Sequence, residues 1–228
     1  MINRKEVVNY VRNSKNESFQ QRYGQLDVIF KDKFVNDIDD ESVFIKAQSM
    51  IPRHIFYLID AVYIGDFDFF KEKKINASYM DGTLYISNVQ DDEDDMLDDI
   101  IHEIAHACEE KYGSFLYQDG EIEMEFFKKR KKLKSLLNSL GIDSNLDFAN
   151  LEYNEAFDKF LHEEIGYEKL SILTNDIFIN PYAITSLREY FASGFEAFYL
   201  GETSFLKTLS PYIYKKVYAL HAGEADEY

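Results

Sequence analysis

Residues 96–108 read Met-Leu-Asp-Asp-Ile-Ile-His-Glu-Ile-Ala-His-Ala-Cys. The apolar side chains of this stretch recur every three or four positions, which is the period of an α-helix that buries one face. Five consecutive acidic residues, 91–95, come directly before it, where they suit the positive end of a helix dipole. We therefore predict a helix that begins near Met96 and includes Cys108.

His102, Glu103 and His106 form an H-E-x-x-H motif within this predicted helix. The two histidines are one turn apart on the same face, so both imidazoles can reach one ion. Zn²⁺ takes neutral imidazole nitrogens and keeps a position for water in catalytic sites. A neighbouring carboxylate can accept the proton of that water as it attacks a carbonyl. The motif indicates a catalytic zinc site with Glu103 as general base; surface histidines and a structural metal site are the alternatives.

A catalytic zinc site needs a third protein ligand, and the same helix does not offer one. In the extended motif H-E-x-x-H-x-x-G-x-x-H, the glycine and the last histidine correspond here to Glu109 and Tyr112. We expect Glu109 to be a solvated side chain. The two histidines further along the chain, His162 and His221, lie in no evident motif. A glutamate from a second helix is therefore the better expectation.

Two glutamates are candidates for this ligand. Glu189 lies in a helix predicted over residues 185–200, and Glu155 begins a helix predicted over residues 155–164. Ser186 precedes Glu189 by three positions, which is also the spacing of a capping box that would use the carboxylate to close the helix N-terminus. We favour Glu189 as the ligand and keep Glu155 as the alternative.

Composition restricts the partners and the compartment. The 228 residues include 25 lysines and arginines against 42 aspartates and glutamates, a formal net charge of −17. Such a charge opposes binding to nucleic acid and to anionic membranes, whereas it attracts a basic peptide or serves solubility. The single cysteine, Cys108, excludes an intramolecular disulfide and is expected to be a buried apolar side chain. Without a signal-like or membrane-spanning apolar run, a cytoplasmic protein is the expectation.

Secondary-structure patterns predict an α+β fold in a single domain, residues 1–228. The N-terminal segment, residues 1–50, is expected to be helical at 3–13 and 41–49. Residues 61–64 favour a buried strand, and residues 75–79 and 84–87 flank Asp81-Gly82, a signal for a tight hairpin. An outer strand of this hairpin, at 77–79 or 85–87, could pair with an extended substrate. Two more helices are predicted, residues 121–140 with the basic run 128–132 on a solvated face and residues 207–220 with a break at Pro211.

The H-E-x-x-H motif, followed by Glu189-Tyr190-Phe191-Ala192, resembles the catalytic domain of the lethal factor-like zinc metallopeptidases, a family that includes the Pro-Pro endopeptidases. Tyr182, seven residues before Glu189, matches the family's tyrosine. The resemblance implies a zincin-like α+β domain with a small mixed sheet, an edge strand over the motif helix, and a mostly helical C-terminal half. It implies Glu189 as the zinc ligand and Tyr182 as the hydrogen-bond donor to the oxyanion of the tetrahedral intermediate.

The chain departs from this family in two places. The family has a second glutamate four residues after the ligand, where this chain has Ser193, and Glu196 is the candidate to contact a zinc-binding imidazole instead. The long interval from His106 to Glu189 suggests a helical insertion over residues 121–168 that restricts access to the cleft. The expected function is a zinc endopeptidase acting on a protein or peptide. The alternative is an interaction protein with a structural zinc site.

Overall fold

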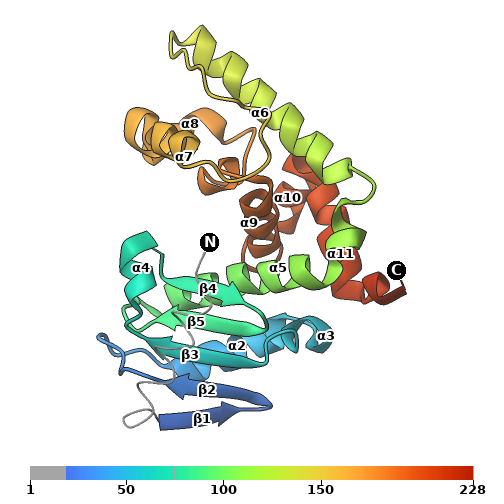
Figure 1. Ribbon diagram of the computed structural model, residues 1–228. Coiled ribbons are helices and arrows are strands. Elements are labelled where there is room, and N and C mark those ends of the chain that lie inside the picture. Colours follow the sequence, from blue (N-terminus) through green and yellow to red (C-terminus); the bar gives the residue numbers. More distant parts are fainter. Residues whose placement is uncertain (1–18, 74, 228) are drawn as a thin grey trace. The chain divides into compact units, whose positions relative to one another are not determined.

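The computed structural model describes residues 19–73 and 75–227 (Figure 1). It divides into two compact units, one up to Cys108 and one from Glu109 onward. The boundary falls inside helix α5 (Glu93–Tyr117), whose backbone leaves helical geometry at Tyr112 (φ −113°, ψ 18°). All the described strands belong to the first unit, so the predicted α+β class is confirmed. The single domain stays a prediction, because the division lies within a helix.

The first unit is built around a mixed five-stranded sheet with the order β1-β2-β3-β5-β4. Strands β2, β3 and β5 run parallel, and the two edge strands, β1 and β4, pair antiparallel with their neighbours. The strands are β1 (Phe19–Tyr23), β2 (Leu26–Phe30), β3 (Ala61–Gly65), β4 (Ala77–Met80) and β5 (Thr83–Ser87).

The predicted hairpin around Asp81-Gly82 is confirmed. Strands β4 and β5 are joined by these two residues, whose φ angles are +48° and +78°. Positive φ at both central positions is typical of the type I′ turn that matches the twist of antiparallel strands, and Asp-Gly is one of the residue pairs that favour this turn. Strand β5 lies between β3 and β4, so residues 85–87 cannot pair with a substrate, and that alternative is wrong. At this edge of the sheet, β4 is the strand that a substrate could join.

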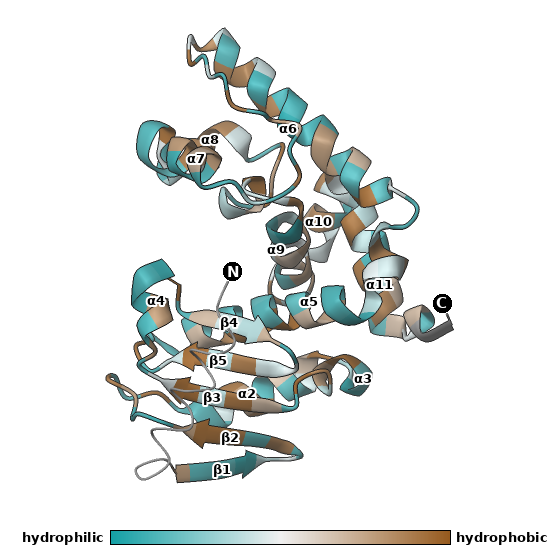
Figure 2. Cartoon of the chain, in the orientation of Figure 1, coloured by the Kyte–Doolittle hydropathy of each residue, from teal (hydrophilic) through white to brown (hydrophobic). Residues whose placement is uncertain are grey.

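One face of the sheet forms the core of this unit. Side chains alternate along each strand, and two cross-strand rows are at most 3% exposed. The rows are Val28-Val62-Leu84 and Phe30-Ile64-Ile86. Burying each such side chain contributes about 1.5–3 kcal/mol. Figure 2 shows apolar residues along the three parallel strands, whereas the edge strand β1 is mostly hydrophilic.

The opposite face of the sheet carries an aromatic cluster. Tyr63 and Tyr85 are register partners on β3 and β5, and their rings stack with centroids 5.7 Å apart. The loop and helix that follow β3 add Phe67, Phe69 and Phe70, with Phe67 and Phe69 edge-on to Tyr85. The short helices of the unit are α3 (Arg53–Phe56) and α4 (Asp68–Lys73).

The predicted helical N-terminal segment over residues 1–50 is partly wrong. Helix α2 (Asp40–Met50) matches the helix expected at 41–49, but residues 19–30 form the β1–β2 hairpin. The turn uses Gly24 at φ +65°, and burial alternates strictly along β2. Tyr23, at the end of β1, stacks on Phe44 of α2 and donates a hydrogen bond to Asp40. The helix expected at residues 3–13 lies outside the described residues.

The second unit contains only helices among its described residues. They are α6 (Glu121–Ser139), α7 (Glu155–Lys159), the π-helical η1 (Phe160–Ile165), α8 (Tyr167–Thr174), the short η2 (Tyr182–Ile184), α9 (Leu187–Leu200), α10 (Thr203–Leu209), α11 (Pro211–Ala222) and η3 (Glu224–Glu227). The helices predicted at 121–140 and 185–200 are confirmed to within two residues. The one predicted at 155–164 is found as α7 and η1, and Pro211 does separate two helices, although α10 begins earlier, at Thr203.

Buried polar contacts tie α6 to α9 and α11. Glu125 accepts a hydrogen bond from the Tyr190 hydroxyl at 2.6 Å and another from the backbone N–H of Tyr212 at 3.2 Å. Where α9 and α11 approach, a Cβ on Gly194 would lie 2.3 Å from Cγ2 of Ile213. Glycine is therefore needed at this position of α9, because any larger residue would force the two helices apart.

Candidate metal centre

The H-E-x-x-H motif lies within α5, as predicted. His102 and His106 are one turn apart, with ring centroids 5.1 Å apart and ring planes at 81°. The apolar residues around them, Ile100, Ile101 and Ile104, are at most 1% exposed, so packing fixes the rotation of the helix about its axis. That rotation brings the two imidazoles side by side on the remaining face.

The edge strand β4 contacts the motif helix through Glu103. The backbone N–H of Tyr79 donates a hydrogen bond to Glu103 Oε2 at 2.6 Å. In an antiparallel pair of strands, hydrogen-bonded and non-hydrogen-bonded residue pairs alternate. The Met80–Thr83 pair closes the hairpin and is hydrogen-bonded, so the next pair, Tyr79–Leu84, is not, and the N–H of Tyr79 points away from β5. A main-chain donor at the sheet edge therefore orients the candidate general base.

Asp99, one turn before His102, has a strongly perturbed acidity. Burial raises the pKa of its carboxyl from 3.8 to about 7, against the opposing effect of a 3.2 Å hydrogen bond from Gln90. The charges of Asp95 and Glu103 raise this pKa further. Water-poor surroundings disfavour the charged form of a carboxyl group. Asp99 therefore exchanges its proton close to neutral pH.

Glu189 lies in the first turn of α9. The hydroxyl of Ser186, the N-cap, accepts a hydrogen bond from the backbone N–H of Glu189 at 3.1 Å, which is the serine side of the predicted capping box. His102, His106 and Glu189 each offer one ligand atom, and these three atoms lie within 4.8 Å of one another. Donors around a tetrahedral ion with bonds of ~2.1 Å are about 3.4 Å apart. With small side-chain adjustments, this group could therefore hold a metal ion.

The other candidate ligands are engaged elsewhere. Glu155 is exposed and forms an ion pair with Lys159 at 2.7 Å, which lowers the pKa of the glutamate. His162 and His221 are exposed, with their rings against Tyr167 and Tyr199 respectively. Within the part of the chain that the structure describes, the group that could hold an ion contains Glu189 and not these residues.

Glu109 is not the solvated side chain that the sequence suggests. Its side chain is 13% exposed, and its carboxylate accepts a hydrogen bond from the Tyr117 hydroxyl and lies 3.4 Å from Nε of Arg188. Arg188 directly precedes Glu189, so this ion pair anchors the first turn of α9 to the second half of α5. The contact joins residues far apart in the sequence, and no local pattern announces it.

Ser193 is at the position where the resemblance implies a second glutamate. It is fully buried, and its hydroxyl donates a hydrogen bond to Asn180 Oδ1 at 3.3 Å. The same oxygen accepts from the backbone N–H of Ala183 at 2.8 Å. These bonds connect α9 to the turn that carries Tyr182, a residue 38% exposed at the start of η2.

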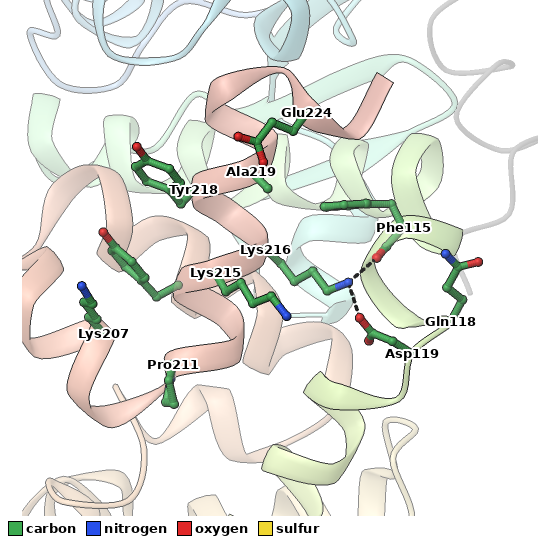
Figure 3. Close-up of a pocket in the computed structure, with 11 residues that line it drawn as sticks. Phe115, Gln118, Asp119, Lys207, Pro211, Lys215, Lys216, Tyr218, Ala219 and Glu224 are labelled. Carbon is green, nitrogen blue, oxygen red and sulfur yellow. Dashed lines mark hydrogen bonds and ion pairs between the residues drawn. The ribbon is translucent and has the colours of Figure 1, made fainter. Parts of the chain in front are cut away.

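A cavity of about 590 Å³ lies elsewhere in the second unit, among α10, α11 and the end of α5 (Figure 3). On its wall, Lys216 donates 2.6 Å hydrogen bonds to the Phe115 carbonyl and to Asp119. That carbonyl is in the last turn of α5, where acceptors lack partners within the helix. Lys215 is paired with Glu121 at 2.7 Å. These lysines serve structure, and none of the three residues of the metal group lines this cavity.

Comparisons with models of known protein families, with curated proteins and with solved structures found no match. None of the described helices combines the length and the apolar character that a bilayer span requires. The function must therefore be inferred from the chemistry of the residues themselves.

Proposed function

We propose that the protein is a zinc-dependent endopeptidase of the zincin type. The observation that carries the proposal is the approach of His102, His106 and Glu189 to within 4.8 Å, with Glu103 next to the first ligand. Two imidazoles and one carboxylate are the ligand set of many catalytic zinc sites, in which water takes the fourth position. The donor chemistry thus suits zinc better than calcium or magnesium, which prefer oxygen ligands.

Bound zinc would polarise a peptide carbonyl and lower the pKa of its water to about 7. Glu103 accepts a proton from the attacking water and passes it to the nitrogen of the departing amine. The Tyr79 N–H bond keeps this carboxylate at the sheet edge, where a peptide would lie. Tyr182, partly exposed at the start of η2, donates a hydrogen bond to the oxyanion that develops on the scissile carbonyl.

A peptide substrate can add to the sheet at β4. In the β4–β5 register the main-chain groups of Ala77 point away from β5. The next outward residue is Tyr79, whose N–H is bonded to Glu103, so its carbonyl is the group that would pair with a substrate. Pairing with an exposed edge gives affinity through the backbone and leaves specificity to side chains. The net charge of −17 favours a basic peptide, and nucleic acid and membrane surfaces are not proposed as partners.

The decisive experiment is Glu103→Gln, with zinc content and peptide cleavage measured on the same preparations. Glutamine can still accept the hydrogen bond from Tyr79, so fold and metal content should persist while cleavage of a broad peptide library is lost. Glu110→Gln is the matched control, because Glu110 is exposed on the same helix and its loss should change neither property.

Undiminished cleavage by a folded Glu103→Gln protein would remove Glu103 as the base. A wild-type chain that binds zinc and cleaves nothing in the library would instead favour an interaction protein with a structural metal site. A wild-type chain without affinity for zinc would refute the proposal as a whole.

A further inference from the structure

We propose that Arg130, from the basic run of α6, is a positioning residue that fixes the segment between Tyr182 and Glu189. The inference rests on the proposed function, since it concerns the same two side chains. The sequence predicts a solvated face for this basic run, but Arg130 is 1% exposed. A solvated helix face does not account for a buried arginine, so the burial of Arg130 requires another explanation.

Each of the three guanidinium nitrogens of Arg130 donates a hydrogen bond to a main-chain carbonyl. Nε donates to the carbonyl of Ile184 at 2.9 Å, Nη2 to that of Thr185 at 2.7 Å, and Nη1 to that of Asn150 at 2.9 Å. The planar group also lies over the ring of Phe157, with its central carbon 4.1 Å from the ring centroid. A planar fork of donors can satisfy several acceptors at fixed angles, which a lysine ammonium cannot do.

Two of these three carbonyls belong to the segment that separates the proposed oxyanion donor from the proposed ligand. The Tyr182 carbonyl accepts hydrogen bonds from the backbone N–H and the hydroxyl of Thr185, at 3.0 and 2.8 Å. Ser186, the next residue, caps the helix in which Glu189 occupies the first turn. Holding Ile184 and Thr185 therefore sets the position of both functional side chains at once.

The third carbonyl connects this segment to a second loop. Asn150 is adjacent to Leu151, whose carbonyl accepts a hydrogen bond from the backbone N–H of Leu187 at 2.8 Å. Arg130 thus connects the segment that contains Ile184 and Thr185 to the loop that contains Asn150. The same two segments are also joined directly by the Leu187–Leu151 hydrogen bond at the start of α9. Removing the donors of Arg130 would leave two buried acceptors, the carbonyls of Ile184 and Thr185, to be solvated or rearranged at about 1–3 kcal/mol each, and a half-buried one at Asn150.

Packing alone does not account for an arginine here. Arg130 occupies a place in the inward stripe of α6 that also contains Phe126, Leu133 and Leu137, all at most 1% exposed. An apolar side chain would fill this place without desolvating a charge. Burial lowers the pKa of Arg130 to about 10, so the group stays charged at neutral pH and keeps all its donors.

The test compares Arg130→Met and Arg130→Lys with Lys129→Met as the matched control. Lys129 is the preceding residue and also donates to a main-chain carbonyl, that of Ile177, and to Ser210 Oγ. Its ammonium lies over the ring of Tyr190 on α9, whereas the described hydrogen bonds to the carbonyls of Ile184 and Thr185 come from Arg130. The readouts are zinc affinity by chelator competition, kcat and KM on a cleaved peptide, and thermal unfolding. Zinc affinity should fall at least tenfold in Arg130→Met and less in Arg130→Lys, with kcat falling more than KM rises. Lys129→Met should lower only the unfolding temperature.

Equal losses of zinc affinity in Arg130→Met and Lys129→Met would overturn the inference, because general loosening would then explain both. Wild-type affinity and kcat in folded Arg130 variants would also overturn it, while leaving the endopeptidase proposal intact. If Arg130→Met does not fold, Arg130→Lys alone decides between these outcomes. A wild-type protein that binds no zinc would remove the proposed function and this inference together.

Discussion

Replacing Asp99 with asparagine should stabilise the protein, and the gain should grow with pH. The folded-state pKa of Asp99 is about 7, whereas its ordinary value is 3.8. Between these values the unfolded chain has released the proton and the folded protein still holds it, so stability falls as pH rises. The slope of this loss is half its maximum at pH 7, and the loss is complete only well above that pH. Asparagine carries no such proton, and its side-chain oxygen can still accept from Gln90.

The size of the effect follows from the same two values. A difference of about 3 pKa units at 1.36 kcal/mol each sets an upper bound of about 4 kcal/mol above pH 7. The bound is not reached in full, because Asp99 keeps some exposure to water. Near pH 4 the advantage of the variant should vanish, and it should increase by no more than about 1.4 kcal/mol per pH unit up to neutrality.

Urea unfolding from pH 4 to 8 measures this difference. The protein should be treated with a chelator, since metal binding to His102 would release protons and add its own pH dependence. Asp91→Asn is the control, because Asp91 is exposed just before the same helix and its stability profile should run parallel to that of the wild type. A constant difference between Asp99→Asn and the wild type across this range would refute the perturbed acidity of Asp99.

Two further substitutions test the proposed oxyanion donor and the packing of the second unit. Tyr182→Phe should lower kcat by about a hundredfold with little change in KM, since removal of one oxyanion donor acts on the transition state; an unchanged kcat in steady-state kinetics would exclude that role. Gly194→Ala should lower the unfolding free energy by a net amount of about 2 kcal/mol, because a 2.3 Å approach to Ile213 places the overpacking cost at about 3 kcal/mol and helix propensity returns only ~1 kcal/mol. Ile213→Leu removes Cγ2 and should restore part of the loss in a thermal unfolding assay, and a Gly194→Ala protein as stable as wild type would contradict the close approach of the two helices.

The elements that could be predicted from the sequence are those whose signals are local. Asp81-Gly82 specifies a turn by its own backbone preferences, and Ser186 caps a helix through the N–H three residues later. Pro211 ends one helix and begins the next because it lacks an N–H. Each of these signals is complete within about four residues, so no knowledge of the remaining fold is required.

The missed elements depend on partners far along the chain. Strand β1 has four exposed residues out of five, so it shows no alternation, and its pairing with β2 decides its conformation. The parallel pairing of β2 with β3 joins residues more than 30 positions apart. Nothing in Phe160–Ile165 distinguishes a π-helix from the α-helix that precedes it.

The candidate site shows the same division. The spacing of His102 and His106 places them together on any helix, whereas the sequence offers two candidates for the third ligand, Glu189 and Glu155. Of these two, the group that could hold an ion contains Glu189. The prediction that Glu109 is solvated is wrong because its partner, Arg188, lies far along the chain. The burial of Arg130 could have been predicted, because its position falls in the apolar stripe of α6. The four other basic residues of the run 128–132 hide this spacing and favour a solvated face.

The lone cysteine makes the motif helix open to a simple kinetic probe. Cys108 is 0% exposed and follows His106 by two positions on α5. A thiol reagent can modify this side chain only when the helix around it opens locally, so the rate of labelling reports how often such opening occurs. Because the chain has one thiol, the native sequence needs no engineered reporter, and slower labelling in the presence of zinc would support the proposed metal site.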